Sequence, residues 1–126
     1  MMAKKILVID DEELVSESLK KLLKKQGYDA TVARSGVEAL AKIKDGEFDL
    51  IVSDIRMSDM NGIEIVRRIR AHLKENGKKP VPEILITGYA SEDNLEEAKR
   101  LNVADYIYKP FNIKEFLDIV RRNLIS

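Results

Sequence analysis

The sequence predicts an α/β fold in which five parallel strands alternate with five helices in a doubly wound sheet. Five short apolar runs recur along the 126 residues, and amphipathic segments separate them. Most of these runs are apolar at nearly every position, which is typical of parallel strands that are buried on both faces. Because crossovers between parallel strands are right-handed, we expect helices on both faces of the sheet.

Each predicted strand is an apolar run that ends in polar or charged residues. The five strands are Lys5–Ile9, Asp29–Ala33, Asp49–Ser53, Glu83–Thr87 and Ala104–Tyr108. In an open sheet of this kind the chemistry lies beyond the carboxyl ends of the strands. The first and third strands are expected to be neighbours, so the residues that end them should adjoin.

The segments between the strands are predicted to be helices because their apolar residues fall at helical spacing. The apolar set of the first helix is Leu14, Val15, Leu19, Leu22 and Leu23, and that of the last is Phe116, Leu117, Val120 and Leu124. The fourth helix, around residues 91–102, has only Leu95, Ala98 and Leu101. Because this apolar stripe is narrow, burying it stabilises the helix only weakly, and the helix is a candidate for movement.

Capping residues mark several helix ends. Ser35 with Glu38 reads as a capping box, and Asn112 with Glu115 is a looser version of it. Three glycines follow basic or polar last turns and are predicted to be C-terminal caps: Gly27, Gly46 and Gly77.

Composition excludes several classes of protein. The length fits a single domain over residues 1–126. Lys plus Arg and Asp plus Glu are 22 each, which argues against nucleic acid or an anionic membrane as the main partner. Without cysteine there is no disulfide framework. The start of the chain is too short for a signal peptide and no apolar stretch is long enough to span a membrane, so we expect a cytoplasmic protein.

Three acids, a hydroxyl and an ammonium are predicted to meet at one edge of the sheet. They are Asp10, Asp11, Asp54, Thr87 and Lys109. At ~5 Å and an effective dielectric constant near 20, each pair of carboxylates repels by about 3 kcal/mol. A counter-ion is therefore expected, and Mg²⁺ suits carboxylates that share a site with phosphate oxygens. Taken alone, Asp10 and Asp11 could merely cap the helix that starts near Glu12.

Asp54 is the candidate nucleophile, because a carboxylate can attack phosphorus and form an aspartyl phosphate. Lys109 would supply a point charge to the phosphoryl oxygens, and Thr87 would donate its hydroxyl to one of them. Lys109 precedes Pro110. A cis bond is accessible before proline, and the turn it makes could aim Lys109 inward.

The chain resembles the receiver domain of two-component response regulators and is similar to single-domain chemotaxis (CheY-like) receivers. The matching motifs are Ile6-Leu7-Val8-Ile9-Asp10-Asp11-Glu12, Asp54 with Met60-Asn61-Gly62, Ile84-Leu85-Ile86-Thr87-Gly88, and Asp105-Tyr106-Ile107-Tyr108-Lys109-Pro110-Phe111. Each is weak alone, but their order and spacing are specific. The resemblance implies a flavodoxin-like sheet with strand order 2-1-3-4-5.

The resemblance also implies a mechanism. Asp54 would take a phosphoryl group from a histidine kinase or a histidine phosphotransfer protein. Asp11, Asp54 and the backbone carbonyl of Arg56 would hold Mg²⁺ or Mn²⁺, with Asp10 acting mainly through water. Thr87 and Tyr106 would form the switch, with Tyr106 turning inward.

Further roles follow from the same resemblance. The surface of the fourth helix, fifth strand and fifth helix would control a downstream target or output domain, and receivers often dimerise through it. Arg56 and Tyr89, two residues after Asp54 and Thr87, would tune the phosphoryl lifetime. Ser58 and Asn61 replace the proline and aspartate of many receivers, and neither adds to the acid pocket.

Three other functions fit the chain less well. A phosphatase with an aspartyl-phosphate intermediate would carry a second acid two residues after its nucleophile, where this chain has Arg56. A flavodoxin-like cofactor binder needs a glycine- or hydroxyl-rich loop after the first strand, and Asp10-Asp11-Glu12 would repel its phosphate. A receiver that serves only for protein interaction should lack a pocket residue, and none is missing. We therefore expect a phosphoacceptor switch and not an enzyme.

Overall fold

Over the residues that it describes, a computed structural model of the chain has five strands and five helices in strict alternation. The structure describes residues 3–88 and 92–124. The elements are β1 (Lys5–Ile9), α1 (Glu13–Lys25), β2 (Asp29–Ala33), α2 (Gly36–Asp45), β3 (Leu50–Asp54), α3 (Gly62–Glu75), β4 (Glu83–Thr87), α4 (Glu92–Leu101), β5 (Asp105–Tyr108) and α5 (Ile113–Leu124).

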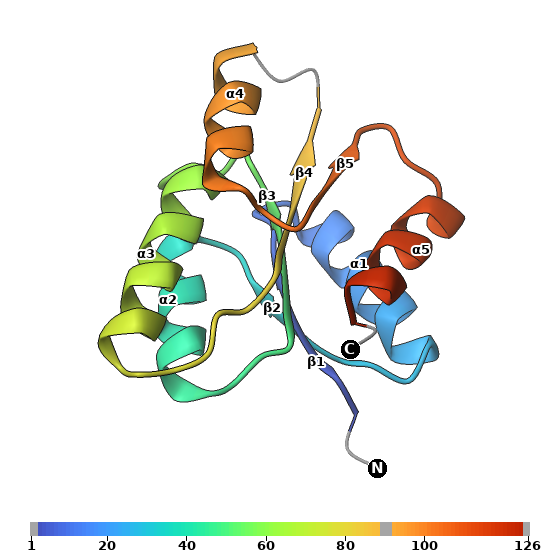
Figure 1. Ribbon diagram of the computed structural model, residues 1–126. Coiled ribbons are helices and arrows are strands. Elements are labelled where there is room, and N and C mark those ends of the chain that lie inside the picture. Colours follow the sequence, from blue (N-terminus) through green and yellow to red (C-terminus); the bar gives the residue numbers. More distant parts are fainter. Residues whose placement is uncertain (1–2, 89–91, 125–126) are drawn as a thin grey trace.

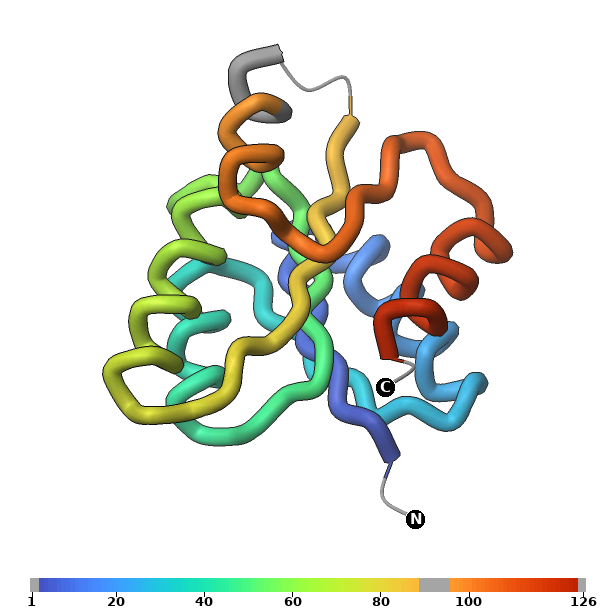
Figure 2. Tube along the Cα trace, in the orientation of Figure 1, coloured from blue at the N-terminus to red at the C-terminus, as the bar shows by residue number. Residues whose placement is uncertain are grey.

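The strands form a single parallel sheet in the order β2-β1-β3-β4-β5, which confirms the predicted topology. Helices α1 and α5 cover one face, and α2, α3 and α4 cover the other (Figure 1). The path of the chain shows the two helical layers on either side of the twisted sheet (Figure 2). Within the described ranges, no helix is long and apolar enough to cross a membrane.

Alternate residues of each central strand supply the two apolar layers of the core. Ile6 and Val8 of β1 pack in a cluster that includes Phe116 of α5. Leu7 and Ile9 point to the other face, where their cluster includes residues of α2 and α3. Side chains of this size contribute about 1.5–3 kcal/mol each when fully buried. The two buried layers therefore fix the sheet that positions the strand ends.

Three strand boundaries, two in β3 and one in β5, differ from the prediction by one residue. β3 begins at Leu50 instead of Asp49, because the Asp49 carboxylate turns back and accepts the N–H of Lys5 at 2.7 Å. The same strand extends to Asp54, which pairs with Ile86 of β4. β5 begins at Asp105 instead of Ala104. Asp54 is thus the last residue of a buried strand.

The predicted helix ends are mostly confirmed. Ser35 accepts the N–H of Glu38, and Asn112 accepts the N–H of Glu115. Gly27 and Gly77 adopt the left-handed conformation, with φ of 88° and 64°. The prediction for Gly46 needs correction in one respect, because this C-cap is extended at φ −154° and requires no glycine.

Two features of the helices were not expected. Asn102, directly after α4, takes the left-handed conformation at φ 55°. Leu14 was assigned to the apolar stripe of α1 but is 85% exposed, because it lies on the solvent side of that helix. Ala98 of α4 is fully buried, whereas the side chain of Leu95 lies outside the described residues.

Candidate functional site

The carboxyl ends of β1, β3, β4 and β5 meet at one edge of the sheet, as predicted. Asp10 follows β1, while Asp54 and Thr87 end β3 and β4. Lys109 follows β5 and its Nζ donates to Asp54 Oδ2 at 2.7 Å. Residues that lie 55 positions apart in the chain are therefore brought into direct contact by the parallel sheet.

Asp54 is held on both sides. Its side chain is almost completely buried, and Oδ1 accepts the backbone N–H of Arg56 at 3.0 Å. Lys109 is placed by its own backbone N–H, which donates to the carbonyl of Thr87 at 2.7 Å. Burial of the ammonium acts to lower its pKa, but the hydrogen bond and charge of Asp54 outweigh that effect, so the pKa of Lys109 is raised. Lys109 is thus a fixed cation at neutral pH.

Asp10 is a buried carboxylate that is only half satisfied. Its Oδ1 accepts the N–H of Glu12 at 2.9 Å, whereas Oδ2 is buried without a hydrogen-bond partner among the described residues. Burial raises the pKa of Asp10, and the negative charge of Asp54 raises it further. An unpartnered buried carboxylate oxygen is unusual in a native protein, and a nearby cation would satisfy it.

Asp11 is half-buried, and its Oδ2 accepts the N–H of Ser58 at 3.0 Å. Asp10 accepts the N–H of Glu12, which directly precedes α1, but the N-cap of that helix has no side-chain cap hydrogen bond. Across residues 3–88 and 92–124, no group of three His, Cys, Asp or Glu side chains is arranged to hold a metal ion. The donors nevertheless suit Mg²⁺ chemically, since all are oxygens and one has no other partner.

The remaining predicted residues surround this cluster. Thr87 is buried, and its hydroxyl donates to the carbonyl of Gly88 over a long 3.4 Å. Tyr106 is half-buried against the cluster of Ile55, Ile63, Val66, Leu85, Ala98 and Val103. Arg56 is exposed, and the Lys109–Pro110 peptide bond is cis. Tyr89, a predicted tuning residue, lies outside the described residues.

Sequence reasoning missed Asp59, which lies in the loop that joins β3 to α3. Its carboxylate accepts the N–H groups of Gly36 and Val37 at the start of α2. The only signal in the sequence was an acid within a turn, which does not reveal a partner 23 residues away.

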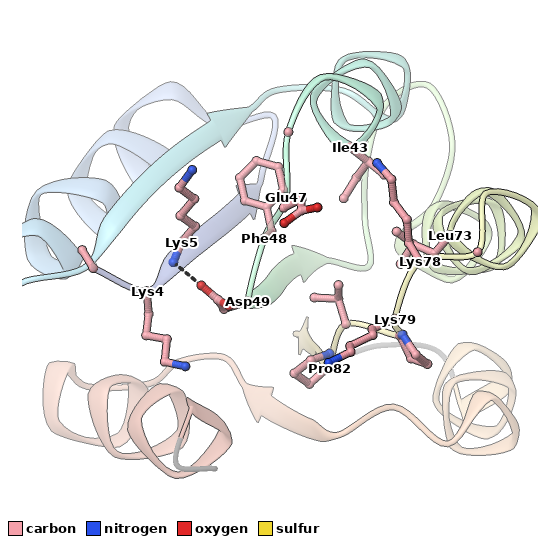
Figure 3. A pocket seen from close by; sticks show the side chains of 15 residues that line it. Lys4, Lys5, Ile43, Glu47, Phe48, Asp49, Leu73, Lys78, Lys79 and Pro82 are labelled. Atoms are coloured by element: carbon pink, nitrogen blue, oxygen red, sulfur yellow. Dashed lines mark hydrogen bonds between the residues drawn. The ribbon is translucent and has the colours of Figure 1, made fainter. Parts of the chain in front are cut away.

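A hollow lies at the opposite, amino-terminal edge of the sheet (Figure 3). It has a volume of about 740 Å³, with Phe48 and Leu73 among its apolar lining and Lys78 and Lys79 among its lysines. The residues that line it include none of those predicted for the site. Its position therefore separates it from the acid cluster.

Comparisons with known proteins identify relatives over nearly the whole chain. A family model described as "Response regulator receiver domain" matches residues 6–121. Sporulation initiation phosphotransferase F of Bacillus subtilis is 33% identical over 124 residues, which cover 98% of this chain and 96% of that protein. Regulatory protein AtoC of Escherichia coli is 36% identical over 120 residues. These are 95% of this chain but only 25% of AtoC, so the chain spans a quarter of that longer relative.

Solved structures give the same result. The chemotaxis protein CheY4 of Vibrio cholerae superposes with a TM-score of 0.87 at 31% identity, covering 98% of this chain and 100% of that one. A CheY-like receiver domain of Methanospirillum hungatei gives a TM-score of 0.86 at 32% identity, covering 98% and 94%. The agreement extends over the sheet and the helices on both of its faces.

Proposed function

This chain belongs to the response regulator receiver family of two-component signalling, and on that premise we propose that Asp54 is its phosphoacceptor. A receiver domain is a phosphoacceptor switch rather than a catalytic enzyme. The observation that carries the proposal is the contact of Lys109 Nζ with Asp54 Oδ2, beside the unpartnered oxygen of Asp10. The donor would be a sensor histidine kinase or a histidine phosphotransfer protein, and the same premise supports a cytoplasmic location.

In the proposed step, a carboxylate oxygen of Asp54 attacks the phosphorus of a phosphohistidine. An O–P bond forms and the P–N bond breaks, and the imidazole nitrogen leaves with the electron pair and takes up a proton. Lys109 then pairs with a phosphoryl oxygen, for which its ammonium is already placed. The hydroxyl of Thr87 is free to turn toward another, since its present contact is long.

The receiver family typically binds Mg²⁺. We propose that Asp11, Asp54 and the backbone carbonyl of Arg56 hold Mg²⁺ or Mn²⁺ here, with Asp10 contributing through water. When bound, the ion would offset the negative charge of these carboxylates and of an incoming phosphoryl group. The buried, unpartnered Oδ2 of Asp10 supports this assignment.

The output would pass through Thr87 and Tyr106 to the surface of α4, β5 and α5. Tyr106 is half-buried against the cluster that includes Ala98 of α4, so a turn of its ring would change the packing against that cluster. Phosphorylation adds about −1.5 to −2 charges. It shifts the conformational equilibrium only by its differential contacts with the two states.

We propose that residues 1–126 form one receiver domain whose α4–β5–α5 surface docks a downstream target or output domain, or a second copy of the chain. The relationship to AtoC, of which the chain spans a quarter, supports a receiver that serves a longer regulator. The relationship to sporulation initiation phosphotransferase F, which the chain spans almost entirely, supports partners in a phosphorelay.

Intact mass after incubation with acetyl phosphate tests the acceptor role directly. The parent should gain one phosphoryl group in the presence of Mg²⁺ and none when the metal is removed by chelation. Asp54→Asn should gain none, because the amide is not a competent nucleophile. Asp49→Asn is the matched control, since Asp49 precedes the opposite end of the same strand.

A gain that persists in Asp54→Asn would contradict the assignment. A parent that gains no mass is tested with beryllofluoride, which mimics a phosphoryl group without turnover. Binding of beryllofluoride would indicate rapid hydrolysis, and its absence would reject the phosphoacceptor function.

A further inference from the structure

The β3–α3 loop, residues 55–61, carries Arg56 and is fastened to two other parts of the molecule. Toward the site, the N–H of Arg56 donates to Asp54 and the N–H of Ser58 donates to Asp11. At its base, the N–H of Gly62 donates to the carbonyl of Ile55 at 2.7 Å. The geometry of this loop therefore decides where the Arg56 carbonyl and the Asp11 carboxylate stand relative to Asp54.

The far side of the loop is fastened to α2 by Asp59. Its Oδ1 accepts the N–H of Gly36 at 3.0 Å and its Oδ2 accepts the N–H of Val37 at 3.1 Å. Oδ1 also accepts the N–H of Met60 at 2.9 Å, which fixes the carboxylate against its own loop. The hydrogen bond from Gly36, together with those from Val37 and Met60, holds the pKa of Asp59 below its ordinary value.

Helix α2 divides its first N–H groups between two acceptors. The N–H of Glu38 goes to Ser35, the cap of the helix itself, while those of Gly36 and Val37 go to Asp59 from another element. These amides have no partner within the helix, and the positive end of the helix dipole favours a carboxylate there. The contact therefore serves both the helix and the loop.

Packing holds the same junction together. A Cβ atom on Gly36 would lie 2.7 Å from the Sδ of Met60, so the Met60 side chain occupies the space that a side chain at position 36 would need. Met60 directly follows Asp59 and is partly buried against the cluster that includes Ala39 and Ile43 of α2. The loop thus rests on α2 through one charged and one apolar side chain in succession.

We propose that Asp59 is a positioning residue for the phosphoacceptor site: by anchoring the β3–α3 loop to α2, it holds the Arg56 carbonyl and the Ser58–Asp11 contact in place for the divalent cation. This inference rests on the proposed function, because it concerns the same site. Asp59 need touch neither metal nor phosphate. It acts through the loop, whose Ser58 adjoins it and bonds to Asp11.

The test compares Asp59→Ala and Asp59→Asn with Ser35→Ala, which removes the other cap of the same helix. Mg²⁺ affinity is measured by calorimetry in the absence of any phosphoryl donor. We expect Asp59→Ala to weaken Mg²⁺ binding about tenfold, the lower end of the range for groups that orient metal ligands. Asp59→Asn should lose less, because it keeps an oxygen acceptor, and Ser35→Ala should bind Mg²⁺ as the parent does.

Amide hydrogen exchange without metal gives an independent reading. Exchange at the N–H of Ser58 should accelerate in Asp59→Ala but not in Ser35→Ala, whereas both variants should accelerate exchange in the first turn of α2. Equal effects of the two substitutions on Mg²⁺ affinity and on Ser58 would overturn the proposal, because Asp59 would then only cap the helix. A parent that binds no Mg²⁺ would overturn it too, while mass gain from acetyl phosphate reports separately on Asp54.

Discussion

Two buried carboxylates of the central sheet are paired with cations at opposite edges, and the pairs are built differently. At the amino-terminal edge, both oxygens of Glu83 accept from Arg70, through Nε and Nη2 at 2.8 Å each. Arg70 Nη1 also donates to the carbonyl of Leu101 at 2.6 Å, so each of the three guanidinium nitrogens makes a hydrogen bond. At the carboxyl edge, Lys109 meets Asp54 with a single 2.7 Å contact beside the unpartnered oxygen of Asp10.

The difference separates a permanent contact from an exchangeable one. A guanidinium fork that binds a carboxylate through two nitrogens is geometrically specific, and it joins α3, β4 and the end of α4. An ammonium is a compact point charge on a flexible stem and can pass from one oxygen to another. The acid edge also retains uncompensated negative charge. The carboxyl edge is therefore suited to bind a cation and a phosphoryl group, whereas the contacts of the amino-terminal edge are suited to a permanent structural role.

The largest effect on stability is expected at the Arg70–Glu83 pair. Arg70→Met leaves Glu83 buried without its partner, so the free energy of unfolding should fall by about 3 kcal/mol, the low end for a buried pair because Arg70 is partly exposed. Chemical denaturation measures the change. Arg68→Met is the matched control: its exposed pair with Glu64 should be worth no more than about 0.5 kcal/mol. Equal losses in both variants would contradict the comparison.

Gly62→Ala should be next, and it concerns the acid edge. The added Cβ would lie 2.5 Å from the carbonyl oxygen of Asp54 and 3.0 Å from the Cα of Ile55, which are backbone atoms that cannot turn aside. We expect a loss of about 2 kcal/mol and slower phosphoryl uptake from acetyl phosphate, because the backbone of Asp54 must shift. Unchanged stability and uptake would show that the loop is more compliant than its contacts indicate.

Asp10→Asn should act in the opposite direction, raising the free energy of unfolding at pH 7 by about 1 kcal/mol without divalent cations. The substitution keeps the oxygen that accepts from Glu12 and removes an incompletely satisfied buried charge. Because the pKa of Asp10 is raised in the folded state, the folded protein holds this proton more tightly than the unfolded chain. The stabilisation that protonated Asp10 gives the folded state is complete below the ordinary carboxyl pKa. It is lost as the pH rises through the raised pKa of Asp10.

The pH dependence of thermal unfolding can detect the contribution of Asp10 ionisation to stability. The parent should lose stability relative to Asp10→Asn from the ordinary pKa of 3.8 upward, and the variant should bind Mg²⁺ more weakly. Parallel pH profiles for the two proteins would reject the interpretation of Asp10 as an uncompensated charge.

The smallest effect is expected for Gly46→Ala, at the amino-terminal edge. Gly46 has an extended backbone, and a Cβ there would meet only the carbonyl of Lys42 at 3.9 Å. Alanine should fit and raise the free energy of unfolding by about 0.5 kcal/mol by restricting the unfolded chain. A loss of 1 kcal/mol or more would show that this helix end needs glycine after all.

The sequence predicts the strands and helices, which depend on local pattern. It does not predict side-chain contacts between residues that are far apart in the chain. Continuous apolar runs indicated the strands. Because functional groups in open parallel sheets gather beyond the carboxyl ends of the strands, the sequence alone predicted that Asp54 and Lys109 lie close together. The Arg70–Glu83 pair was missed, although a charged residue that opens a buried strand was a signal for a partner. Leu14 was wrongly assigned to the buried face of α1. Helical spacing shows which residues lie on the same side of a helix, but it does not show how much of that side the rest of the protein covers. Asp59 was not predicted because its partners, Gly36 and Val37, lie in the connection between β2 and β3, whereas Asp59 lies in the connection between β3 and β4.

The fifth strand is the last in the sheet order, so one side of its backbone faces no neighbouring strand of this sheet. Exposed edges of this kind can template pairing with another chain and begin aggregation. Here the edge is only four residues long, and the carboxylate of Asp105 at its start is engaged by Arg122 and Asn123 of α5. Lys109 and Pro110 follow at its end. Strand addition along this edge is therefore discouraged.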